Sequence, residues 1–192
     1  MCSSDLAAAG ASLMIRLFAA LAVPEAVAQG LGACQSGLAG AHWHEPEALH
    51  ITLRFFGEVD QTVAEDLDSE LAKLAARGQA LTLSIDGVGV FNQGERLNAV
   101  WAALRPNEAL NILAGRCEAA ARRAGLAPDK RKYMPHITLA YLKNTPPAAV
   151  TAWLAEHALL RSDPFSVRQF GLYSSWRTPQ GAHYRLERVY RL

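Results

Sequence analysis

Cysteine and net charge are both scarce in this sequence. Three cysteines, Cys2, Cys34 and Cys117, occur in 192 residues, and no two of them form a C-x-x-C pair. This odd number and wide spacing argue against a disulfide scaffold or a structural zinc site, and they suit a reducing compartment, so we expect a cytoplasmic protein. The formal net charge is only +1, which excludes a globally basic surface for nucleic acid or membranes. Any anionic ligand must therefore be held by a local patch.

Long apolar runs are also missing, and no stretch approaches the length of a membrane span. The segment "MIRLFAALAVPEAVA" does imitate an export signal, because a short apolar run follows Arg16 and ends at a cleavage-like Ala-Val-Ala. Apolar residues at helical spacing continue beyond it, at Val27, Leu31, Cys34 and Leu38, so we interpret 14–22 as a buried strand that precedes a helix. Residues 1–13 carry neither periodicity nor motif and are predicted to be a disordered leader, which leaves 14–192 as a single bilobal domain.

The tetrapeptide His-Ile-Thr-Leu occurs twice, at residues 50–53 and 136–139. Periodicity predicts the order strand, helix, strand, helix, strand in each half of the chain. Each tetrapeptide lies near the start of the middle strand of its half. The predicted ranges are 14–22, 24–39, 49–57, 61–77 and 80–91, then 97–104, 107–125, 135–143, 146–160 and 165–174, with a last strand at 183–191. Thr62 and Asn107 are the expected N-caps of two of these helices. The sequence thus predicts an α+β fold of two pseudo-symmetric halves around a central cleft.

The residue types in the repeat suit proton transfer at phosphorus. Side chains alternate along a strand, so His50 and Thr52 share one face, as do His136 and Thr138, while the isoleucine and leucine of each repeat face the core. If the halves are related by a two-fold axis, one imidazole can accept a proton while the other donates one on the opposite side of a phosphorus atom. The threonine hydroxyls can donate to the phosphate oxygens. A single such tetrapeptide would more often be an ordinary buried strand; the matched context of both favours a site.

Paired H-x-T-x motifs at this interval resemble the two-histidine phosphoesterases. The stretches "IRLFAAL", "WHEPEALHITLRFFGEV", "YMPHITLAYL" and "GAHYRLERVYRL" are similar to the RNA 2′,3′-cyclic phosphodiesterases, also called 2′-5′ RNA ligases. The resemblance implies a bilobal fold and an enzyme that opens RNA 2′,3′-cyclic phosphate ends to 2′-phosphates without metal or other cofactor. It also implies slow 2′-5′ ligation in some members. By the same resemblance His50 protonates the leaving 3′ oxygen and His136 activates water. We expect the protein to act as a monomer.

One position departs from that pattern. Many relatives have an arginine five residues after the second histidine, where this chain has Tyr141. Strand alternation makes Arg54 the preferred replacement cation, because it shares the face of His50 and Thr52; a solvated strand end is the alternative. Phe18, on the first strand, is a candidate to stack on a base, with core packing as the alternative.

A local basic tract precedes and includes the second repeat. Residues 116–143 contain seven Lys and Arg against two acids, a composition that suits contact with RNA phosphates, although the arginines of the predicted helix can equally form its solvated face.

Three other interpretations remain open from the sequence. His42 and His44 precede His50 closely enough to suggest a zinc site, but no cysteine or acid is spaced to complete it. A catalytically silent RNA-end-binding module on the same scaffold is the second alternative, and a cyclic-nucleotide phosphodiesterase is the third.

Overall fold

The computed structural model describes residues 14–94, 96–178 and 181–192, so the predicted leader at 1–13 lies outside the described residues. Antiparallel pairing joins seven strands in the order β10-β9-β1-β3-β7-β6-β5, with β2 added on β7, and a separate pair is formed by β4 and β8. The strand bounds are β1 Ile15–Ala22, β2 Ala41–Trp43, β3 His50–Val59, β4 Leu81–Leu83, β5 Ile85–Gln93, β6 Arg96–Leu104, β7 His136–Leu142, β8 Phe165–Val167, β9 Gln169–Thr178 and β10 Gly181–Arg191.

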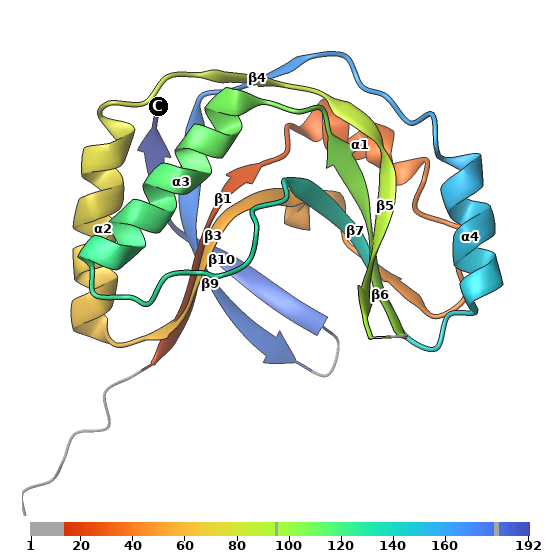
Figure 1. Cartoon of the computed structure of the whole chain (residues 1–192), viewed down its shortest axis with the longest axis horizontal. Helices are drawn as coiled ribbons and strands as arrows, with labels where there is room; N and C mark the ends of the chain where they lie inside the picture. Colours follow the sequence, from red (N-terminus) through yellow and green to blue (C-terminus); the bar gives the residue numbers. More distant parts are fainter. Residues whose placement is uncertain (1–13, 95, 179–180) are drawn as a thin grey trace, which may run out of the picture.

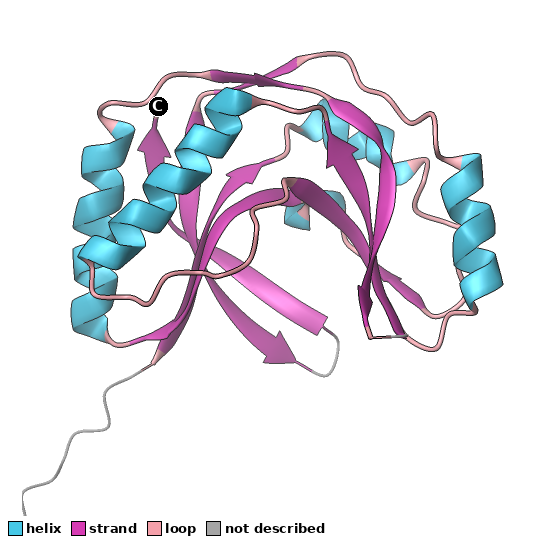
Figure 2. Cartoon of the chain, in the orientation of Figure 1, coloured by secondary structure: helices cyan, strands magenta, loops and turns pink. Residues whose placement is uncertain are grey.

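Four α-helices of the described chain cover the ends of the sheet in two pairs (Figures 1 and 2). The helices are α1 Glu25–Gly32, α2 Gln61–Ala75, α3 Glu108–Arg123 and α4 Pro147–Glu156, and a 3-10 turn, η1, spans Pro46–Ala48. Helices α2 and α3 pack on each other and on the side that contains β1, β3 and β10. On the other side, the indole of Trp153 in α4 contacts Trp43 of β2 at a ring distance of 6.0 Å and donates to the carbonyl of Cys34, just after α1. The molecule is therefore α+β and bilobal, as predicted.

The two lobes differ from the two halves of the sequence. We define the first lobe as β1, β3, β9 and β10 with α2 and α3, and the second lobe as β2, β5, β6 and β7 with α1 and α4. Strand β5 comes from the first half but pairs with β6, while β9 comes from the second half but pairs with β1. Each half therefore contributes to both lobes, because the first half adds α1, β2 and β5 to the second lobe and the second half adds α3, β9 and β10 to the first. Strand β10, which the sequence could not place, pairs with β9 as a hairpin.

Most predicted elements are present, with informative differences at their ends. The predicted strands 80–91 and 165–174 are each split, into β4 and β5 and into β8 and β9, and the short strands β4 and β8 pair with each other. Helix α1 ends at Gly32, not at 39, because the chain turns there and the amide of Cys34 donates to the carbonyl of Leu31 at 3.0 Å. Asn107 caps α3 as predicted, through its bond to the amide of Leu110.

The predicted cap of α2 is wrong. Asp60, not Thr62, is the N-cap, and its carboxylate accepts from the amide of Val63 at 2.9 Å. The prediction fails because both Asp60 and Thr62 are residue types that can cap a helix. Asp60 comes first, and the helix begins there, directly after the end of β3.

Among the described residues, none of the helices combines the length and the hydrophobicity that a membrane span requires. The stretch that imitates an export signal instead forms strand β1, whose residues from Leu17 to Leu21 are buried in the core, and the first residues of α1.

Candidate active site

The two His-Ile-Thr-Leu repeats lie side by side at the centre of the sheet, at the start of β3 and β7. The strands run antiparallel with Ile51 opposite Ile137, so each histidine lies across from the threonine of the other repeat. The two isoleucines are 0 % exposed, whereas the four polar side chains of the repeats are partly exposed on the opposite face: His50, Thr52, His136 and Thr138. The structure thus brings all four predicted catalytic residues onto one face.

The imidazoles are oriented in the same way by the backbone that precedes them. The Nδ1 atom of His50 lies 2.7 Å from the carbonyl oxygen of Ala48, and Nδ1 of His136 lies 2.7 Å from that of Met134. A carbonyl oxygen can only accept, so Nδ1 carries the proton in each ring. Nε2 is therefore the atom of each ring that is left to exchange protons, which is the arrangement that general acid–base catalysis requires.

The surroundings disfavour the charged form of both rings. Burial lowers the pKa of His50 to about 4, the bond to the Ala48 carbonyl opposes this shift, and the nearby His44 and His136 add to it. Burial likewise lowers the pKa of His136, against the effect of its bond to Met134. Burial therefore favours the neutral form of both rings in the free protein, and an anion beside a ring would favour its charged form.

Aromatic side chains surround each histidine, and they differ between the two. His50 contacts Phe18 and Tyr184, each at a ring distance of 5.1 Å, while His136 meets Phe91 edge-on at 4.7 Å and Trp101 at 6.0 Å. These contacts restrict the planes of the two imidazoles. The two histidines therefore share a backbone geometry but have different neighbours.

Phe18 does not lie where a base could stack on it. Its side chain is 3 % exposed, and its ring stacks on Tyr173 at 5.3 Å and meets Tyr184 edge-on. The predicted base-stacking role is thus replaced by the packing alternative, in which Phe18 supports His50. Tyr184, which sequence reasoning missed, comes from the C-terminal hairpin, and its only sequence signal is its place in the closing "GAHYRLERVYRL".

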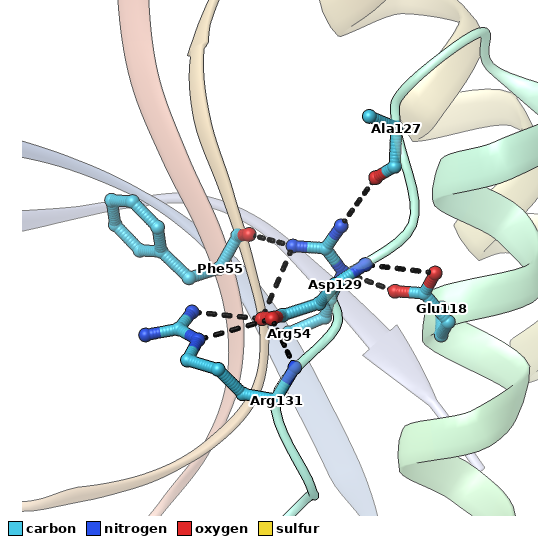
Figure 3. A network of polar contacts seen from close by, with 6 residues as sticks. All are labelled: Arg54, Phe55, Glu118, Ala127, Asp129 and Arg131. Atoms are coloured by element: carbon cyan, nitrogen blue, oxygen red, sulfur yellow. Dashed lines mark hydrogen bonds and ion pairs between the residues drawn. The ribbon is translucent and has the colours of Figure 1, made fainter.

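Arg54 follows an irregularity in β3, where the register with β1 shifts between Thr52 and Arg54, and its guanidinium is occupied by protein groups (Figure 3). Its guanidinium forms an ion pair with Glu118 of α3, donates to the carbonyls of Phe55 and Ala127, and lies 3.8 Å from a carboxylate oxygen of Asp129. The side chain is only 11 % exposed. Its charge is therefore matched by two carboxylates, and the predicted role as replacement cation for the phosphate is not supported by this placement.

Tyr141 reaches the cleft because β7 is irregular. The register with β6 shifts between Val100 and Trp101, so that Leu139 and Ala140 are both buried and Tyr141 returns to the side of His136. Tyr141 is 45 % exposed, packs against His44 at a ring distance of 5.3 Å and hydrogen-bonds with the hydroxyl of Tyr184. Its hydroxyl can bind an anion only as a neutral donor, unlike an arginine.

A pocket of about 870 Å³ opens beside the second repeat. Its walls come from β3, β5, β6, β7, α3 and the segment between α3 and β7. The lining includes Thr52, Arg54, Phe91, Asn98, Asn111, Lys132, His136, Thr138 and Tyr141. The volume is near the upper end of the roughly 300–1,000 Å³ found for small-molecule sites. The pocket can therefore hold more than one nucleotide next to the catalytic face.

The basic tract is divided by the fold. Arg123 pairs with Glu70 of α2, and Arg116 donates to the carbonyl of Arg77, so these helix residues face α2, away from the pocket. Arg131 and Lys132 line the pocket; Arg131 is paired with Asp129, whereas Lys132 forms no ion pair with any described residue. The solvated-face interpretation holds for the helix, whereas Arg131 and Lys132, in the segment between α3 and β7, lie near the site.

The possible zinc ligands are not assembled in the described chain. His42 is exposed on β2, and no group of three or more His, Cys, Asp or Glu among residues 14–94, 96–178 and 181–192 is placed to hold a metal ion. Cys34 and Cys117 are buried free thiols.

Known proteins share both sequence and structure with this chain. It is 31 % identical over 145 residues to the RNA 2′,3′-cyclic phosphodiesterase of Aeropyrum pernix, a match that covers 73 % of this chain and 80 % of the relative. The Archaeoglobus fulgidus protein of the same name is 28 % identical over 179 residues, covering 92 % and 99 %.

Solved structures agree over nearly the whole length. Thermus thermophilus TT0787 superposes with a TM-score of 0.77 at 24 % identity and covers 93 % of this chain and 98 % of that chain, which concerns the fold alone. LigT of E. coli, solved in complex with 3′-AMP, gives a TM-score of 0.73 at 25 % identity with 94 % and 99 % coverage. Residues 23–178 match the family described as the 2′-5′ RNA ligase superfamily. With the paired repeats, the bilobal sheet and this match together, the chain belongs to the 2′-5′ RNA ligase superfamily.

Proposed function

We propose that the protein hydrolyses the 2′,3′-cyclic phosphate at the end of an RNA to a 2′-phosphate, with the two repeat histidines as acid and base. The observation that carries this proposal is the symmetric pair of imidazoles on adjacent strands, each with Nδ1 bound to a backbone carbonyl and Nε2 available. Relatives that carry the name RNA 2′,3′-cyclic phosphodiesterase match most of the chain.

The chemistry assigns one proton to each ring. Nε2 of His136 takes a proton from water as its oxygen attacks phosphorus, and protonated Nε2 of His50 gives its proton to O3′ as the P–O3′ bond breaks. The phosphate stays on O2′, His50 ends neutral and His136 ends charged, and proton exchange with solvent restores both. Thr52 and Thr138 lie next to the opposite histidine, where their hydroxyls can donate to the non-bridging oxygens.

The same site can also join RNA ends. If a 5′-hydroxyl oxygen takes the place of water, attack at phosphorus with loss of O3′ leaves a 2′-5′ phosphodiester. Both reactions use the same two proton transfers, so ligation is expected to disappear with hydrolysis in the histidine variants.

The pocket favours an RNA end over a free cyclic nucleotide. Its volume of about 870 Å³ exceeds the space needed beside the histidines for one nucleotide, and Arg131 and Lys132 lie in its wall. Lys132, which forms no ion pair with a described residue, suits the phosphate of a nucleotide that precedes the terminal one.

The test is turnover of a short oligonucleotide with a 2′,3′-cyclic phosphate end. His50→Ala and His136→Ala should each lower turnover by at least about 10²-fold, the usual scale for loss of a general acid or base. Phosphorus NMR of the product should show a 2′-phosphomonoester. Normal turnover by either folded variant would refute the assignment, and tight binding without turnover by the parent would favour the silent binding module.

A further inference from the structure

The spacing of the two histidines is not set by pairing of their own strands alone. Within the described chain, β3 and β7 share a single register pair, Ile51 with Ile137. Beyond that pair β3 continues beside β1 and β7 continues beside β6. Acid–base catalysis at one phosphorus nevertheless requires the two rings to be placed to within a fraction of an ångström. Other contacts must therefore hold one repeat relative to the other.

On the side of His50, a backbone ladder provides those contacts. The segment that leads to His50 includes β2, whose Ala41 and Trp43 pair with Leu142 and Ala140 of β7. The amide of His44 adds a bond to the carbonyl of Leu139 at 2.9 Å. The chain entering the first repeat is thus fixed to the strand of the second repeat.

The symmetric position on the side of His136 has no ladder. Residues 127–129 stand before His136 at the same interval as residues 41–43 stand before His50. Likewise, residues 54–56 stand after His50 at the same interval as residues 140–142 stand after His136. Pseudo-symmetry would therefore pair 127–129 with 54–56. The described residues 127–129 are in neither strand nor helix, so backbone pairing does not join the second entering segment to β3.

Side chains make the connection at that place (Figure 3). Nη2 of Arg54 donates to the carbonyl of Ala127 at 2.9 Å, and Nη1 lies 3.8 Å from Asp129. These are the positions that correspond by symmetry to the β2–β7 ladder. Closer to the histidine, the hydroxyl of Tyr133 donates to the carbonyl of Thr52 at 3.2 Å.

We propose that Arg54 and Tyr133 are positioning residues that replace the missing ladder and set the place of His136 relative to His50. The inference rests on the proposed function. Glu118 of α3 holds the guanidinium from behind, and the planar fork of arginine reaches several acceptors at once, which the single ammonium of lysine does not. Neither residue needs to touch substrate for this role.

The main test is Tyr133→Phe, which removes one hydroxyl and little else. Its matched control is Tyr190→Phe, because the Tyr190 hydroxyl donates to Asp68 at 2.6 Å between β10 and α2, away from the repeats. A misplacement of about 1 Å can cost about 10²-fold in rate. We expect Tyr133→Phe to lower kcat for the cyclic-phosphate oligonucleotide about 10- to 100-fold with KM within twofold, and Tyr190→Phe to leave both unchanged.

A second readout separates positioning from a loss of fold. The five-coordinate vanadium of a uridine–vanadate complex imitates the transition state. The affinity of this complex for Tyr133→Phe should be lower than for the parent by about the same factor as kcat, whereas uridine 2′-phosphate should bind the parent and Tyr133→Phe equally. Equal vanadate affinity in the parent and Tyr133→Phe would overturn the inference, as would equal kcat in Tyr133→Phe and Tyr190→Phe.

Arg54→Lys distinguishes positioning from substrate binding. It keeps the charge but loses the fork, so we expect kcat to fall with little change in KM or in the salt dependence of KM. A raised and strongly salt-dependent KM with normal kcat would show that Arg54 binds phosphate and would overturn its positioning role. A parent protein that leaves the cyclic phosphate intact would defeat the proposed function itself, whereas an active parent with normal variants defeats only the inference.

Discussion

The pKa of His50 offers a direct test of how the site is charged. Burial holds this pKa at about 4, so the ring is almost wholly neutral at pH 7, yet a ring that protonates O3′ must first carry a proton. To be half protonated at pH 7 in the complex, the pKa must rise by about 3 units, which corresponds to roughly 4 kcal/mol at 1.36 kcal/mol per unit. One negative charge about 4 Å away supplies about 4 kcal/mol at an effective dielectric constant of 20. A single phosphodiester charge is therefore sufficient.

The assay is NMR titration of the histidine Cε1 protons, with His50→Gln used to assign the His50 signal. In the free protein, the signal should not titrate between pH 5.5 and 8; with saturating uridine 2′-phosphate it should titrate near neutrality. A His50 signal that titrates near 6.5 without ligand, or that does not respond to the nucleotide, would refute this reasoning.

Four further outcomes are expected. The pKa of His50 in the folded protein is below its unfolded value of 6.5, so its contribution to stability is present above pH 6.5 and is lost as the pH falls toward 4. The free energy of unfolding, measured with urea, should drop by about 3 kcal/mol between about pH 6.5 and about pH 4. The His50→Gln variant should show a smaller drop over the same pH range. Asp60→Ala should cost about 1 kcal/mol as loss of an N-cap, whereas Thr62→Ala should cost less than about 0.5 kcal/mol; the reverse order would contradict the observed cap. Lys132→Ala should reduce the salt slope of RNA binding by about 1 with kcat unchanged, and an unaltered slope would place the RNA elsewhere. Turnover should persist in excess EDTA, and its loss there with recovery on adding a metal ion would contradict a mechanism based on proton transfer alone.

Local patterns in the sequence predict much of the fold and the two histidines. Alternation correctly places His50 and Thr52 on one face, because β3 is regular over that stretch. The same rule fails at Tyr141, where the shift in register after Thr138 reverses the faces. A bulge depends on the partner strand, which no local pattern specifies.

Long-range partners account for the other failures. Arg54 follows a shift in the register of β3 with β1, and its charge is matched by Glu118, which lies 64 residues away in the sequence. Phe18 is on the expected strand, but Tyr173 and Tyr184 from the C-terminal hairpin cover its ring. Alternation gives the direction of a side chain and not what occupies the space in front of it, so the shell around the histidines could not be read from sequence.

The exchange of β5 and β9 between the lobes has a consequence for how the molecule is made. The first lobe is completed only when β9 arrives to pair with β1, and β1 and β9 stand at opposite ends of the chain. A nascent chain that has emerged only as far as residue 135 contains His50 but lacks the second repeat, and it also lacks Tyr184, which contacts the His50 ring. Each half of the sequence therefore needs a strand from the other half to complete its lobe.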